Sequence, residues 1–257
     1  MNDSNVSWQT YVSFVNDIVY ENILSTIGIS LGYIVEQMYP SNNLAPLFES
    51  QLELLDPSLV FVPSLDPNDK DGFNNLLILL IDDIMKMSSI FKCLKSNEKS
   101  YMTAILKNSD IIDMKYEILE SVEKVVEEAT EFCNGFERYS YLWLDDRDKC
   151  MEMFLEYGRF LESDELDFIV MRDSNAPQPC QPSIEAFREQ IENYESLYAE
   201  IEKIHPFQVF NTWFQVDVRP FRQSLLNIVR KWGNMFKNHL VNRVTSSLID
   251  LANFIRQ

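Results

Sequence analysis

The chain has 257 residues, of which 46% are hydrophobic and 12% aromatic, so it can bury a sizeable core and is not a disordered chain. A formal net charge of −18 at pH 7 argues against nucleic-acid binding by the chain as a whole, because phosphate backbones bind clusters of Lys and Arg. The four cysteines form no C-x-x-C pair and the longest wholly apolar run, residues 76–81, is far short of the ~20 residues that span a bilayer, so we expect no disulfide framework, no zinc site and no membrane insertion.

The first predicted element is a helix over residues 8–39, where apolar side chains recur at helical spacing until Pro40 ends the pattern. Inside it, the letters G-I-S-L-G match the G-x-S-x-G pattern around the catalytic serine of α/β-hydrolases. That serine needs a preceding strand and a sharp turn. Because Ser30 lies inside a helical pattern, we interpret Gly28 and Gly32 as small residues that let another helix approach closely.

After this helix, the spacing of the apolar residues changes from the helical period to the alternating period of a strand. Residues 48–54 alternate apolar and polar, and residues 59–62 are β-prone, which predicts a small β-hairpin near 47–62. Helical spacing returns over residues 72–94, 108–142 and 145–161, with a polar link at 95–100.

The last third of the sequence contains a loop and two helices. Residues 172–183 hold three prolines and no apolar period, which predicts a mobile loop. Ser183 is placed to cap the next helix, whose apolar residues from 184 to 201 step alternately by three and four, as in a coiled coil. After an aromatic connector, Pro220 stands in the first turn of a helix that runs to about residue 254 and is about 50 Å long.

These elements predict a mainly α fold, an elongated array of long-helix bundles with one small β-hairpin. We divide it into a helical-bundle segment over 1–171 that includes the hairpin, the Pro-rich loop at 172–183, and a segment over 184–257 with the coiled-coil-like helix and the long C-terminal helix. Residues 217–257 carry seven basic and two acidic residues, a net of +5, within a strongly acidic chain. We expect that basic end to match an acidic surface within the chain or on a partner.

Two acidic clusters resemble the aspartate-rich motif with which all-helical prenyl-diphosphate enzymes hold Mg²⁺. They are Asp82 and Asp83 in one stretch, and Asp145, Asp146 and Asp148 in the other. Such a site needs hard oxygen ligands from two facing helices. Lys86 stands where the first cluster needs a third acid, and Arg147 and Lys149 are interleaved with the second. We favour helix caps and solvated faces, and keep a Mg²⁺-dependent enzyme as an alternative.

Other catalytic patterns are weaker. Glu202 and His205 match the E-x-x-H of di-iron bundles, which requires two such motifs, but Phe236 stands three residues before the only other histidine, His239. We interpret the match as a helix carboxyl end with a favourably placed histidine. No P-loop or G-x-G-x-x-G pattern occurs. We therefore predict no catalytic residue, metal ligand or cofactor in this chain.

Three stretches together resemble the tail, or stem, of dynein heavy chains just N-terminal to the linker. They are PLFESQLELLDPSLVFVPSL at 46–65, FERYSYLWLDDR at 136–147, and residues 216–255, which include VDVRPFRQSLLNIVRKWGNMF. Their order and spacing match, the likeness runs over nearly the whole chain, and it is nearest to the axonemal outer-arm, beta-type chains.

The resemblance implies a very large parent polypeptide, a minus-end-directed microtubule motor of ciliary movement with an AAA+ ATPase ring. This chain would hold none of the ring, which alone would bind ATP and Mg²⁺. It would be a structural and assembly segment that couples the cargo-bound tail to the linker, in the cytoplasm, the cytoskeleton and the axoneme of the cilium. Implied partners are the rest of the heavy chain, the dynein intermediate and light chains, and neighbouring heavy chains. A free-standing helical adaptor, whose stripe at 184–201 binds a partner helix, is a further alternative.

Within this interpretation we expect aromatic anchors along the helix seams. Tyr139, Leu142 and Trp143 would anchor one bundle helix. Asp145 or Asp146 would cap the next, and Arg147 would pair across the junction. Further candidates for structural or interaction roles are Phe187, Tyr194, Pro220, Phe221, Trp232 and Phe236.

Overall fold

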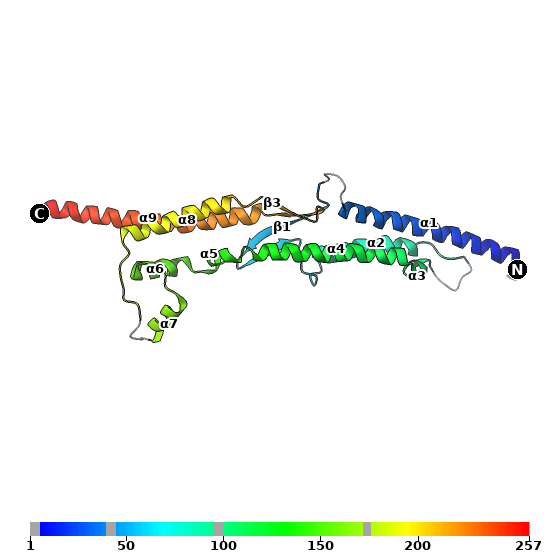
Figure 1. Cartoon of the computed structure of the whole chain (residues 1–257), viewed down its shortest axis with the longest axis horizontal. Helices are drawn as coiled ribbons and strands as arrows, with labels where there is room; N and C mark the ends of the chain where they lie inside the picture. Colours follow the sequence, from blue (N-terminus) through cyan, green and yellow to red (C-terminus); the bar gives the residue numbers. More distant parts are fainter. Residues whose placement is uncertain (1–5, 40–44, 95–99, 172–175, 257) are drawn as a thin grey trace. The chain divides into compact units, whose positions relative to one another are not determined.

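The structure, a computed structural model, describes residues 6–39, 45–94, 100–171 and 176–256. Most of these residues are helical, which confirms the mainly α fold (Figure 1). They fall into two compact units, each assembled from separate stretches of the chain. The first unit comprises Met1–Glu53, Val60–Asn134 and Phe207–Asp217, and the second comprises Leu54–Leu59, Gly135–Pro206 and Val218–Gln257. The division at 172–183 into two sequence segments stays a prediction.

The first unit combines packed helices with a small sheet. Its elements are α1 (Val6–Met38), β1 (Phe48–Leu55), β2 (Ser58–Val62), α2 (Phe73–Lys86), the short 3-10 helix η1 (Met87–Ser89), α3 (Met102–Ile105), α4 (Ser109–Asn134), β3 (Phe207–Phe210) and β4 (Phe214–Asp217). The tip of the β1–β2 hairpin, Leu54–Leu59, groups with the second unit. The helix predicted over 72–94 ends early, at Lys86, and the polar link at 95–100 lies almost wholly outside the described residues.

Helix α1 packs chiefly against α4 through apolar residues at helical spacing. The buried residues are Val12, Ile23, Ile27, Leu31, Ile34 and Met38 on α1, and Ile111, Ile118, Val122, Val125 and Ala129 on α4. By length and composition alone α1 is also apolar enough to cross a membrane. The core helices of soluble proteins meet the same criterion, so this property by itself assigns no membrane.

Ser30 lies in the interior of α1, where its hydroxyl donates a hydrogen bond to the carbonyl oxygen of Thr26 at 2.9 Å. The structure therefore confirms a helix in place of the nucleophile turn of a hydrolase. The expected close helix approach at the two glycines is wrong. A Cβ added at Gly28 would lie 3.9 Å from the Met114 methyl carbon, an ordinary contact, and one added at Gly32 would meet nothing within 4 Å.

The sheet is larger than the single predicted hairpin. Its strand order is β2-β1-β4-β3, with β1 and β4 parallel and β3 and β4 antiparallel. The aromatic connector expected at 206–216 forms the second hairpin, because F-Q-V-F and F-Q-V-D alternate with the period of a strand. Asn211 and Thr212 turn the chain with positive φ of 45° and 68°. An Asn-Thr turn lacks the Asn-Gly signal by which such hairpins are usually predicted.

The second unit is all helical apart from its loops and the hairpin tip. Its elements are the 3-10 helix η2 (Glu137–Tyr139), α5 (Tyr141–Leu144), α6 (Arg147–Tyr157), α7 (Ser163–Met171), α8 (Ile184–Glu202) and α9 (Arg219–Arg256). The helix predicted over 108–142 is interrupted after Asn134, where Gly135 follows, and α7 was not predicted. The described part of the Pro-rich segment, residues 176–183, contains no helix or strand.

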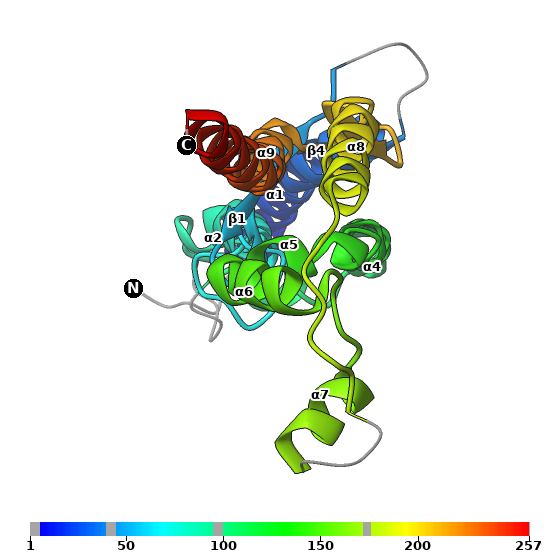
Figure 2. The ribbon, with the colours of Figure 1, turned by 90° about the vertical axis from the view of Figure 1, so that its left-hand side faces the viewer.

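Helices α8 and α9 lie side by side (Figures 1 and 2). They form an antiparallel pair, since Phe187 near the start of α8 meets Phe236, whereas Tyr194 further along meets Trp232, earlier in α9. Ser183 caps α8 as predicted, because its hydroxyl accepts a hydrogen bond from the Ala186 backbone nitrogen at 3.0 Å. Pro220 is the second residue of α9, where a missing N–H costs nothing.

Candidate interaction site: the aromatic seam and the tryptophan junction

The α8–α9 interface is built from aromatic rings that we call the aromatic seam. Its members are Phe154 of α6, Phe187 and Tyr194 of α8, and Trp232 and Phe236 of α9. The Tyr194 ring stacks between Trp232 and Phe236, with centroids 5.7 and 5.6 Å away and interplanar angles of 17° and 27°. Phe154 meets Phe236 edge to face at 5.1 Å. Each such pair contributes about 0.5–1.5 kcal/mol beyond burial.

The seam also accounts for the apolar stripe predicted over 184–201. Phe187, Tyr194 and Ile201 are buried, each seven residues from the next. Helix α9 of the same chain covers them. The adaptor alternative needs this stripe free for a foreign helix, so the structure contradicts it.

Tyr194 is almost wholly buried, and burial raises the pKa of its hydroxyl far above the usual value. The ring is therefore neutral throughout the physiological range. Gly233 lies beside it on α9, and a Cβ added there would come within 3.5 Å of the Tyr194 Cβ atom. An alanine at this position would therefore meet the Tyr194 side chain at the distance of ordinary van der Waals contact.

A second cluster, which we call the tryptophan junction, joins the hairpin tip, α5 and α9 within the second unit. It consists of Pro57, Leu142, Trp143, Phe221 and Trp232. The Trp232 indole nitrogen donates to the Leu142 carbonyl oxygen at 2.9 Å in a buried site. The Trp143 indole nitrogen donates to the Pro57 carbonyl oxygen at 3.0 Å, and its ring meets Phe221 edge to face at 6.3 Å.

A groove of about 550 Å³ opens at this junction. It is lined by Leu54, Asp56, Leu142, Trp143, Arg147, Ser224, Asn227, Ile228, Lys231 and Trp232. Among these residues there is one carboxylate and neither a histidine nor a cysteine. The groove thus carries one acidic side chain, Asp56, and two basic ones, Arg147 and Lys231.

Tyr139 binds across to α8. Its hydroxyl donates to a Glu200 carboxylate oxygen at 2.8 Å, and the Arg138 guanidinium lies 3.1 Å from the same oxygen and 4.6 Å from the centre of the Tyr139 ring. Burial, followed by the hydrogen bond to Glu200, raises the pKa of Tyr139. The anchor is thus a network rather than a single ring. Sequence reasoning missed Glu200, which lies 61 residues away in a strongly acidic helix.

The acidic residues that follow α5 have local roles. Asp146 is the N-cap of α6, where its carboxylate accepts from the backbone nitrogens of Asp148 at 3.1 Å and Lys149 at 3.3 Å. These hydrogen bonds, that from Lys149 first, lower the pKa of Asp146. Asp145 is the extended residue that ends α5. Arg147 lies 3.9 Å from its neighbour Asp148 and lines the groove, so its ion pair does not cross the junction as expected.

The acidic pair in the first unit is engaged with lysines. Asp83 pairs with Lys86 at 2.8 Å, and Asp82 with Lys115 at 3.4 Å. In the part of the chain that the structure describes, no three His, Cys, Asp or Glu side chains gather where they could hold a metal ion. No observation favours the Mg²⁺-dependent enzyme.

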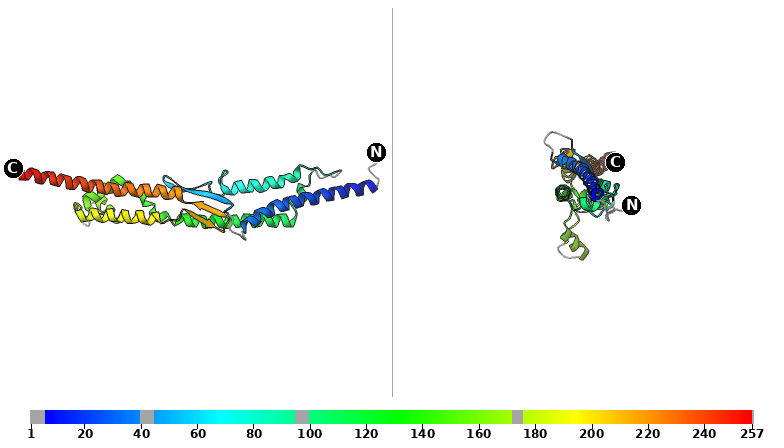
Figure 3. Two further views of the ribbon diagram at one scale, coloured as in Figure 1. Left: turned by 90° about the horizontal axis from the view of Figure 1, so that it is seen from above. Right: turned by 90° about the vertical axis from the view of Figure 1, so that its right-hand side faces the viewer.

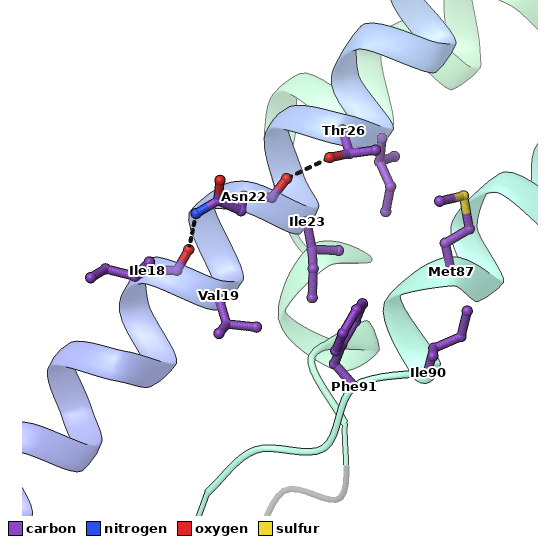
Figure 4. Close-up of a pocket in the computed structure, with 9 residues that line it drawn as sticks. Ile18, Val19, Asn22, Ile23, Thr26, Met87, Ile90 and Phe91 are labelled. Carbon is purple, nitrogen blue, oxygen red and sulfur yellow. Dashed lines mark hydrogen bonds between the residues drawn. The ribbon is translucent and has the colours of Figure 1, made fainter.

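The first unit has an apolar pocket of about 380 Å³ between α1 and the segment after α2 (Figure 4). Val19 and Ile23 of α1 point toward Phe91, and Met87 and Ile90 line the pocket beside it, whereas Ile18 points away (Figure 4). Its two polar residues are bound to α1 itself. The Asn22 amide donates to the Ile18 carbonyl oxygen at 2.7 Å, and the Thr26 hydroxyl donates to the Asn22 carbonyl oxygen at 2.8 Å. The pocket offers apolar surface without reactive groups.

No protein-family model matches the chain. It is 38% identical over 251 residues to "Dynein beta chain, ciliary" of Tripneustes gratilla and 37% identical over 249 residues to "Dynein axonemal heavy chain 17" of Homo sapiens, in both cases over 97% of its own length. The chain belongs to the axonemal dynein heavy chain family. It spans 6% of the length of these relatives. The predicted resemblance to axonemal dynein heavy chains is confirmed, and this dynein segment is placed in the ciliary axoneme, a part of the cytoskeleton.

The three stretches that carry the resemblance meet at the tryptophan junction. Pro57 comes from the stretch at 46–65, Leu142 and Trp143 from that at 136–147, and Phe221 and Trp232 from that at 216–255. The candidate residues Tyr139, Phe187, Tyr194 and Phe236 lie in the same unit. One residue of the first stretch and two from each of the others thus meet in one packed cluster.

Proposed function

We propose that this dynein segment is a load-bearing structural and assembly segment of the heavy-chain tail. It couples the cargo-bound tail to the linker of a minus-end-directed motor of ciliary movement, and it performs no chemical step. The observation that carries the proposal is the tryptophan junction, because the three dynein-like stretches converge there on packing contacts and backbone hydrogen bonds.

The physical support comes from how the second unit is held together. A force along α9 is resisted by stacked rings, by the Trp232 hydrogen bond and by the capped start of α8, so no single loop carries it. Close-packed interiors have low compressibility and transmit strain rather than absorbing it. Such a unit suits a mechanical connection between distant parts of a long polypeptide.

In this proposal ATP and Mg²⁺ are bound only in the AAA+ ring, outside this chain. Its partners are the rest of the heavy chain, the intermediate and light chains, and neighbouring heavy chains. Nucleic acid and membrane insertion have no part in it. The segment needs surfaces for these proteins and needs no cofactor.

Two measurements on the same sample test this function. We expect the chain to co-sediment with a tail fragment that precedes the matched region in the Tripneustes gratilla ciliary dynein beta chain. A prenyl diphosphate with Mg²⁺ should leave its melting temperature unchanged, because a ligand that binds only the folded state raises it. A melting temperature that rises with the diphosphate, together with no co-sedimentation, would contradict the proposal.

A further inference from the structure

The last turns of α9 carry an apolar stripe without a covering element in the described parts of the chain. Its five residues step by three and four, and each is exposed. They are Val241 (61%), Val244 (38%), Leu248 (61%), Leu251 (55%) and Ile255 (73%). Figure 3 shows the red end of α9 running on past the yellow α8. Spacing of this kind is typical of a helix that packs against other helices.

This stripe does not continue the face that α9 buries in the second unit. The buried face contains Leu225, Val229, Trp232 and Phe236, spaced by four and three. Continued at the same spacing, that face would pass through His239, Arg243, Ser246 and Asp250, which are all polar. The exposed stripe lies about 100° around the helix axis from the buried face, which is the rotation of one residue.

The change of face occurs where α8 begins. The Arg243 guanidinium donates a hydrogen bond to the Pro182 carbonyl oxygen, next to the N-cap residue Ser183. The line of the buried face is polar from His239 onward, and beyond Arg243 α8 no longer runs beside α9. The partner of the new stripe therefore lies on another side of α9 and is not an extension of α8.

The residues beside the stripe indicate what covers it. Thr245, Ser247 and Ala252 flank it without charge, and Phe254 widens it with a ring that is 76% exposed. Two-stranded coiled coils usually carry charged residues at these flanking positions, whereas helices of larger bundles have a wider apolar face. The occupant is thus more than one helix, which argues against a simple pairing of α9 with a second copy.

We propose that residues 241–255 form the first helix of a further multi-helix bundle. Its other helices come from the polypeptide that follows the matched region in axonemal dynein heavy chains. The relatives have ample further polypeptide, because 97% of this chain matches only 6% of their length, and the part that continues from the end of α9 is the one nearest to the stripe. The inference rests on the proposed function in that it takes the segment to lie in series with other heavy-chain bundles.

Hydrogen exchange of the backbone amides at 241–256 tests the inference. The probe is a fragment of roughly 100 residues, enough for one domain, that follows the matched region in the Tripneustes gratilla ciliary dynein beta chain. With this fragment present we expect the amides to exchange at least about tenfold more slowly. The double variant Val244→Glu, Leu251→Glu should abolish the protection. Ser246→Glu with Asn253→Glu, on the opposite face, should retain it.

Three outcomes overturn the inference. Exchange that the fragment leaves unchanged would show that this polypeptide does not cover the stripe. Protection that grows with concentration of the chain alone would assign the stripe to a second copy. If an intermediate chain, and not the fragment, protects these amides from exchange, the inference is wrong but the proposed function is still supported. A rise in melting temperature with a prenyl diphosphate and Mg²⁺ would contradict the proposed function, and the exchange result would not depend on it.

Discussion

The indole nitrogen of Trp232 donates a hydrogen bond to the backbone carbonyl oxygen of Leu142, 2.9 Å away, where both residues are buried. The bond joins α9 to α5 across 90 residues of sequence. Trp143, next to Leu142, makes the corresponding bond to Pro57, but that contact is exposed. The two tryptophans thus make the same kind of bond in different surroundings.

This difference predicts unequal effects of Trp→Phe changes. Trp232→Phe leaves the Leu142 carbonyl buried without a partner, which should lower the free energy of unfolding by about 1–3 kcal/mol. Trp143→Phe should have a smaller effect, because water reaches the Pro57 carbonyl. Urea unfolding followed by circular dichroism measures both. Equal effects would mean that burial does not control the strength of the Trp232 bond.

Trp143→Ala should lower the melting temperature by several degrees. It removes the edge-to-face contact with Phe221 as well as the hydrogen bond to Pro57, a loss of about 2 kcal/mol and hence about 4–8 °C for a chain of this size. Tyr116→Ala is the matched control, since that ring is 68% exposed on α4. A melting curve as little changed as that of the control would remove Trp143 as an anchor.

Gly233 gives a test of the α8–α9 spacing. Gly233→Ala should raise the free energy of unfolding by up to about 1 kcal/mol, because alanine favours helix and its Cβ would sit 3.5 Å from that of Tyr194. Gly233→Leu should lower it, since the larger side chain must displace α8. Thermal unfolding of both variants provides the comparison. A stable leucine variant would show that the helices are not in contact here.

Glu165 should titrate at about pH 2 instead of its ordinary 4.5, because Arg159 holds both carboxylate oxygens, at 2.7 and 2.5 Å, and so lowers its pKa. A depressed carboxyl pKa gives stability that is fully present above about pH 4.5 and is lost as the pH falls toward 2. Carbon-13 NMR of the Glu165 carboxyl group measures the pKa. In Arg159→Gln it should return toward 4.5, and an unshifted titration in both proteins would rule out the pair.

The sequence predicted local features well and distant contacts poorly. The cap at Ser183 and the ends of α8 and α9 depend on residues that are close in sequence. Capping residues and apolar spacing therefore predicted them. The second hairpin was missed because the Asn211-Thr212 turn lacks the expected glycine. The hydrogen bond from Trp143 to Pro57 spans 86 residues, and no local pattern specifies it. The resemblance identified the three stretches, but their convergence required the structure.

The central claim, a mechanical segment without chemistry of its own, is tested most directly in an axonemal dynein heavy chain that carries this segment. Trp232→Ala with Phe236→Ala opens the aromatic seam, and Ser246→Ala with Asn253→Ala is the matched control on an exposed face. ATP hydrolysis and the force on sliding microtubules are measured on one preparation. We predict unchanged hydrolysis with reduced force in the seam variant alone. Hydrolysis that falls in step with force would contradict the account.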